Sequence, residues 1–240
     1  MEMDYKRNAR YFTGEIAGRL STVCWIVAVA CAVMLFLRLG WWVYSIAGAI
    51  GLAAVICAIV FSTRSVSDSE YEGICSGLEK TFRTRLTDYI NEELNKNNGR
   101  GKAPVSVDAE KIRFSRSFLY DGETLLRVGQ DDRRRTGKLS FSAYLLEKNR
   151  VFIGYEVHGL VTEAHEEVFG VYPFENIDSI EAFKPEGLSP LADYSRVSIK
   201  LKGKNTPIEF WRANDAELDE LLTVVRSKLT ADAEQETTEE

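Results

Sequence analysis

Two histidines, His158 and His165, are the residues whose type and spacing could most readily support metal chemistry. Both lie in stretches that alternate apolar and polar residues, which predicts two β-strands joined by a hairpin. If the hairpin turns at Val161-Thr162, the imidazoles face each other across the strands, and Glu156 and Glu167 form the next pair on that face. Imidazole and carboxylate are zinc ligands. A solvent-facing polar edge explains these residues without an ion, so neither a metal nor another cofactor is predicted.

A basic cluster is the second candidate for chemistry. It consists of Arg127, Arg133, Arg134, Arg135 and Lys138, in the loop between two expected strands. The planar guanidinium group donates two hydrogen bonds at once to a phosphate, so the cluster suits an anionic lipid or another polyanion. Asp131 and Asp132 precede the arginine triplet, so a simply solvated loop is the alternative.

The sequence carries none of the common catalytic motifs. It contains no nucleophile elbow, no glycine-rich phosphate loop, no zinc motif and no His-x-x-x-His pattern. We therefore expect a protein that is not an enzyme, with no nucleic-acid partner and no small-molecule substrate.

Residues 21–61 form the longest apolar region, in which Arg38 is the only charged residue. A single helix of this length would reach roughly 60 Å, about twice the hydrocarbon thickness of a bilayer. We therefore predict two transmembrane helices, 21–37 and 41–61, that reverse at Arg38-Leu39-Gly40. Arg38, Trp41 and Trp42 are expected at the membrane interface.

The distribution of basic residues predicts the orientation of these spans. Lys6, Arg7, Arg10 and Arg19 precede the first span, and Arg64 follows the second. By the positive-inside rule, both termini are expected in the cytoplasm, in a multi-pass protein of the plasma or inner membrane. A cleaved signal peptide is the alternative for the first stretch, but no clear small-x-small cleavage site follows Leu37.

Small residues within the spans predict close helix packing. The pairs, four residues apart, are Ala28/Ala32, Ala47/Gly51 and Ala54/Ala58. The cysteines Cys24, Cys31, Cys57 and Cys75 are expected to be buried, reduced, small apolar side chains, because they form no Cys-x-x-Cys pair and have no neighbouring His.

The remaining chain divides by pattern. Residues 1–20 read as a basic amphipathic juxtamembrane segment. Residues 62–98 read as an amphipathic helix, in which Arg85 interrupts the best heptad register, so that docking onto the following domain and dimerisation both stay open. A turn-forming linker is expected at 99–109, and a disordered acidic tail at 230–240.

Residues 110–229 predict an α+β domain. Strands are expected at 123–128, 139–145, 151–157, 168–172, 177–183, 197–201 and 208–211, followed by one helix that begins after Asn214 as N-cap and ends near Leu229.

Three stretches of this domain resemble a known family. Residues 145–153, Leu-Leu-Glu-Lys-Asn-Arg-Val-Phe-Ile, are similar to a "Leu-Thr-x-x-Arg" strand-turn-strand segment, with Glu147 in place of the usual Thr. Residues 172–180 are similar to a "Pro-Tyr-x-x-Ile-x-x-Val" strand start, and Ile208-Glu209-Phe210-Trp211 with the following helix resembles a closing unit. On these residues, the region 120–229 resembles the bacterial pleckstrin-homology-like (PH-like) domains.

The resemblance implies an antiparallel β-barrel or sandwich closed by a C-terminal helix, working as a binding or assembly module beside membrane spans. The expected function is to bind a protein partner or further copies of itself at the cytoplasmic face, with membrane lipids around the anchor. One alternative is anionic-lipid sensing through the Arg133–Arg135 loop, which corresponds to the loop that often binds inositol phospholipids in eukaryotic relatives. The other is a small transport or channel component formed by oligomerised hairpins.

Overall fold

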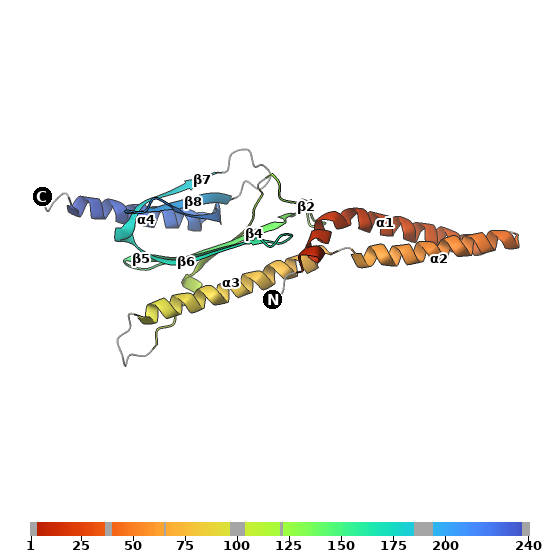
Figure 1. Cartoon of the computed structure of the whole chain (residues 1–240), viewed down its shortest axis with the longest axis horizontal. Helices are drawn as coiled ribbons and strands as arrows, with labels where there is room; N and C mark the ends of the chain where they lie inside the picture. Colours follow the sequence, from red (N-terminus) through yellow and green to blue (C-terminus); the bar gives the residue numbers. More distant parts are fainter. Residues whose placement is uncertain are drawn as a thin grey trace. The chain divides into compact units, whose positions relative to one another are not determined.

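A computed structural model of the chain describes residues 4–36, 40–64, 66–96, 104–120, 122–184 and 194–236. Its helices are α1 (Tyr5–Phe36), α2 (Trp41–Arg64), α3 (Asp68–Lys96) and α4 (Ala216–Glu236) (Figure 1). Its strands are β1 (Arg113–Phe118), β2 (Leu126–Val128), β3 (Arg134–Thr136), β4 (Lys138–Leu146), β5 (Arg150–Gly159), β6 (His165–Pro173), β7 (Ile177–Phe183), β8 (Tyr194–Leu201) and β9 (Ile208–Ala213). The chain forms two compact units, Met1–Gly73 and Ile74–Glu240, and the predicted α+β class is confirmed.

Helices α1 and α2 of the first unit are long and apolar enough to cross a membrane, over Gly18–Leu35 and Trp41–Ser62. These segments agree with the predicted spans, and the exposed Trp41 and Trp42 begin α2. Arg38 lies outside the described residues. Helix α1 begins at Tyr5 and runs on without a break, so the juxtamembrane segment expected at 1–20 is not a separate element.

The two helices pack through small side chains. Buried positions include Ala28, Cys31, Ala47, Ala54 and Ala58. The helices approach closely at Gly51, where an added Cβ would lie 3.1 Å from Cβ of Cys31. The predicted small-residue packing is therefore found, except that Ala32 is exposed and Cys31 takes the inward position one residue earlier.

Helix α3 begins at Asp68, and the first residues of the segment 62–98 belong to α2, which continues to Arg64. Ser67 and Glu70 form a capping box: the Glu70 N–H donates to Ser67 Oγ (3.3 Å) and the Ser67 N–H donates to Glu70 Oε2 (3.0 Å). Within the first unit, the Tyr11 ring stacks on that of Tyr71 with 4.1 Å between centroids. The Tyr11 hydroxyl donates to Asp68 Oδ1 at 2.8 Å, which ties α1 to the first turn of α3.

The second unit contains antiparallel sheets that do not close into a barrel. The four-stranded sheet has the order β1-β4-β5-β6, the three-stranded sheet has the order β7-β8-β9, and β2 and β3 form a separate hairpin. Strands β1 and β3 were not predicted. The core lies between the two larger sheets and α4, and it includes Tyr144, Ile153, Val197, Phe210 and Leu221.

Helix α3 covers the other face of the four-stranded sheet. The Phe82 ring lies 5.7 Å from that of Phe141 and 5.8 Å from that of Phe169. Gly154 in β5 permits this approach, because a Cβ there would lie 2.6 Å from Cδ1 of Leu86. Of the two possibilities left open by the sequence, α3 therefore shows docking onto the domain.

Helix α4 closes the domain. Its N-cap is Asp215, whose carboxylate accepts a hydrogen bond from the Leu218 N–H (2.9 Å), and the prediction of Asn214 as N-cap is wrong by one residue. The helix also continues to Glu236, through much of the tail expected to be disordered at 230–240. Alanine and glutamate are good helix formers and account for this extension.

Candidate functional site

The second unit contains a carboxylate that is fully buried. Glu156 in β5 has no solvent-exposed surface, and its Oε1 accepts three hydrogen bonds. One comes from Nη2 of Arg85 in α3 (2.5 Å), and one each comes from Nε2 of His158 and Nε2 of His165 (both 2.8 Å). We call these four residues, together with Glu167, the Glu156 cluster.

The register of the β5–β6 hairpin builds this cluster. His158 pairs with His165 and Glu156 pairs with Glu167, as the sequence predicted. The two imidazole rings stack with 4.8 Å between centroids. The expectation of a solvent-facing polar edge is wrong for Glu156 and His158, which are buried under α3, whereas His165 and Glu167 on β6 are exposed. The side chain of His158 is only 12% exposed, while that of His165 is 44% exposed.

Arg85 joins the cluster to α3. Its Nη1 lies 2.8 Å from Oε1 of Glu167 while its Nη2 binds Glu156, so one guanidinium bridges two carboxylates on neighbouring strands. This contact explains why a charged residue interrupts the apolar face of α3. That interruption was the sequence signal for a buried acidic partner, although nothing in the pattern of α3 showed which carboxylate would meet it.

The cluster keeps Glu156 ionised. Burial alone would raise its pKa, but the hydrogen bonds from His158, His165 and Arg85 outweigh burial and lower the pKa to about 2. Such a carboxylate is a poor general base near neutral pH. Its second oxygen, Oε2, is buried and has no hydrogen-bond partner among the residues described. The arrangement therefore suits the binding of positive charge better than proton transfer.

The predicted basic cluster forms the β2–β3 hairpin and the start of β4, and it is not one surface. Arg127 pairs with Arg135 across the hairpin. Arg135 is only 3% exposed and makes a bidentate contact with Asp131, at 2.8 and 2.7 Å. The hydrogen bonds from Arg135 hold the pKa of Asp131 well below its usual range. Lys138 is half-buried in β4.

The exposed side chains of the hairpin are both basic and apolar. Arg133 and Arg134 are exposed, and Val128, which pairs with Arg134, is 53% exposed. Leu125 and Leu126 are 43% and 37% exposed. Sequence reasoning missed the contribution of these three apolar residues, because their exposure depends on tertiary pairing: among the residues that the structure describes, β2 pairs with β3 alone.

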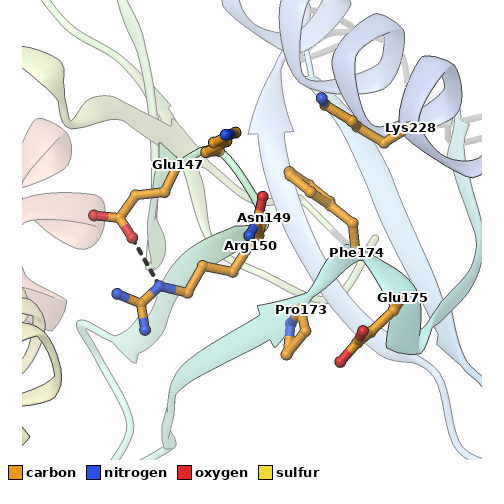
Figure 2. A pocket seen from close by; sticks show the side chains of 8 residues that line it. Glu147, Asn149, Arg150, Pro173, Phe174, Glu175 and Lys228 are labelled. Carbon is orange, nitrogen blue, oxygen red and sulfur yellow. Dashed lines mark hydrogen bonds and ion pairs between the residues drawn. The ribbon is translucent and has the colours of Figure 1, made fainter. Parts of the chain in front are cut away.

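A polar pocket of about 580 Å³ lies at the other turn of β5 (Figure 2). Its lining consists of Glu147, Lys148, Asn149, Arg150, Pro173, Phe174, Glu175 and Lys228. Arg150 Nε donates to Glu147 Oε2 at 2.7 Å. Two of the three stretches that resemble the PH-like family meet here, because the Phe174 N–H donates to the Asn149 carbonyl at 3.0 Å. The lining contains both acidic and basic side chains, and Arg150 is already paired with Glu147, so the residues single out no class of ligand.

Comparison of the chain with protein-family models, with curated proteins and with solved structures finds no match.

Proposed function

We propose that this protein is a non-enzymatic, membrane-anchored module whose PH-like domain binds a protein partner, or a second copy of the chain, at the cytoplasmic face of the membrane. Two observations support the anchor and the domain type. Helices α1 and α2 are long and apolar enough to cross a membrane. Two antiparallel sheets and α4 enclose one core, as the resemblance to PH-like domains implies. The basic residues before the first span support a multi-pass protein with both termini in the cytoplasm.

Strand β6 is the observation that carries the proposal. It extends from His165 to Pro173 and, within the described part of the chain, pairs on one side only, with β5. An edge of this length offers backbone N–H and C=O groups to an added strand. Glu166 and Glu167 place charge at its start, whereas the following residues are mostly apolar and Val168 is 40% exposed.

Native mass spectrometry of the full chain in mild detergent, after cross-linking in membranes, tests this proposal. We expect a dimer or a complex with a partner, and we expect Val168→Lys to reduce it, because a lysine on an edge strand opposes strand addition. Val105→Lys is the matched control, since Val105 is 45% exposed but lies outside every strand. A strictly monomeric protein that recovers no partner would contradict the proposal.

The β2–β3 hairpin favours a second candidate function, the sensing of anionic lipid. Exposed arginines beside exposed Leu125, Leu126 and Val128 match a surface with negative headgroups above an apolar layer. Arg134 and the exposed Arg133, whose Nε also lies 3.7 Å from Asp131 Oδ2, would contact headgroup phosphates, whereas the buried Arg135 would hold the loop through Asp131.

A further inference from the structure

We propose that Glu156, His158 and His165 bind a divalent transition-metal ion, with zinc as the best match. Their ligand atoms all lie within 4.8 Å of one another. Two imidazoles and one carboxylate are a donor set that zinc sites use when a fourth position stays open. Because imidazole nitrogen supplies two of the three ligands, the site favours zinc and related metals over magnesium or calcium, which prefer oxygen.

Shifts of the two imidazole rings separate the observed arrangement from a metal site. At zinc–ligand distances of about 2.0–2.1 Å, two ligand atoms of a tetrahedral ion lie about 3.3 Å apart. Each histidine Nε2 now lies 2.8 Å from Glu156 Oε1, so each ring must move about half an ångström away from that oxygen. The ligand atoms of the two histidines, which lie within 4.8 Å of each other, must also approach to about 3.3 Å. His165 is partly exposed and can make this shift, and its exposed side would admit the ion and a water ligand.

Charge also favours a cation here. The Glu156 cluster contains two carboxylates and one guanidinium, which leaves one negative charge when the imidazoles are neutral. Glu156 Oε2, buried and without a hydrogen-bond partner among the described residues, is a further oxygen that an ion could coordinate.

Arg85 would compete with a metal ion for Glu156, but its contact with Glu167 can hold Arg85 in place while Glu156 binds the ion. Nη1 of Arg85 already binds Glu167, so the guanidinium can remain on that carboxylate while Glu156 turns toward the ion. Each imidazole would then carry its proton on Nδ1 and present the Nε2 lone pair to the metal. The number of protons is unchanged by this tautomer shift.

Metal binding can be measured on the full chain in detergent, after treatment with EDTA and removal of the chelator. Zinc is titrated in competition with a chromogenic chelator after the thiols have been blocked, which removes the four cysteines as ligands. We expect one zinc ion per chain, and binding at least about tenfold weaker in His165→Gln and in His158→Gln. Glu163→Gln, an exposed change in the same hairpin turn, is the matched control and should bind like the parent.

Cobalt(II) provides a second measurement that requires no variant. We expect cobalt(II) bound to the chain to show the visible absorption bands of a site with nitrogen and oxygen ligands. The charge-transfer band of a cobalt–thiolate bond should not appear. Absence of stoichiometric zinc binding after thiol blocking would overturn the proposal. Binding that both histidine variants retain unchanged would also overturn it. This test is independent of partner binding through β6.

Discussion

Arg85 of α3 and Glu156 of β5, 71 residues apart in the sequence, form an ion pair at 2.5 Å in which the carboxylate is fully buried. Around this pair the contact between helix and sheet is aromatic, with Phe82 of α3 against Phe141 and Phe169. The ion pair is therefore a polar contact that fixes how α3 lies on the sheet.

Removal of Arg85 should destabilise the second unit. Arg85→Gln leaves the Glu156 carboxylate buried without its positively charged partner, and we expect the free energy of unfolding to fall by about 2 kcal/mol. A fully buried ion pair would cost more, but Arg85 is partly exposed. Thermal unfolding of the full chain in detergent should show a midpoint about 4–8 °C lower. Lys80→Gln removes an exposed positive charge from the same helix and should leave the midpoint unchanged. Equal midpoints for both variants would argue against a structural role for Arg85.

Acid should weaken the fold through Glu156. Its pKa is about 2 in the folded chain, below the ordinary value of 4.5, so its contribution to stability is complete above about pH 4.5 and is lost as the pH falls toward 2. The shift corresponds to roughly 3 kcal/mol. Unfolding midpoints of metal-free protein between pH 6 and pH 3 should therefore fall more steeply in the parent than in Glu156→Gln. Glu163→Gln should retain the parental slope, and identical slopes in all three proteins would contradict this role of Glu156.

The absence of a side chain at Gly154 should matter for the docking of α3. Gly154→Ala places a Cβ 2.6 Å from Leu86 Cδ1, and we expect a loss of about 1–3 kcal/mol of unfolding free energy. Gly73→Ala within α3 meets no atom within 4 Å and should be neutral or slightly stabilising. Chemical denaturation, with hydrogen exchange of β5 as a local readout, distinguishes the two. A Gly154→Ala variant as stable as the parent would show that α3 does not approach β5 so closely.

The lipid alternative predicts a difference between exposed and buried arginines. In nanodiscs, residues 125–136 of the full chain should gain hydrogen-exchange protection when anionic lipid replaces zwitterionic lipid. The double substitution Arg133→Ala/Arg134→Ala should remove this gain, because each basic residue near an anionic membrane contributes about 1 kcal/mol of binding free energy. Lys202→Ala/Lys204→Ala removes two exposed charges elsewhere in the same unit and should retain it. Equal protection in both lipids for the parent would remove support for lipid sensing.

Local patterns predicted much of the fold. The two apolar helices, the apolar face of α3 and the pairing of His158 with His165 all follow from periodicity and hairpin symmetry. The burial of Glu156 could not be predicted in this way, because the helix that covers its face precedes it by about seventy residues and packing between distant segments leaves no local pattern.

The faces on which the arginines of the basic loop lie could not be predicted from the sequence either. Five basic residues near one turn suggested a single anion-binding surface, but strand alternation turns Arg135 inward while Arg134 stays exposed. Strand β3 was too short to be recognised from its sequence, and without its register the two arginines could not be assigned to opposite faces.

The central claim, that the edge of β6 receives a partner strand, is tested most directly by site-specific photocross-linking in native membranes. A photoreactive amino acid is placed at Val168 and, as the control, at the similarly exposed Val105. Our account predicts an adduct from position 168, with either a second copy of the chain or one reproducible partner, and none from position 105. Equal adducts from both positions, or none from position 168, would contradict it.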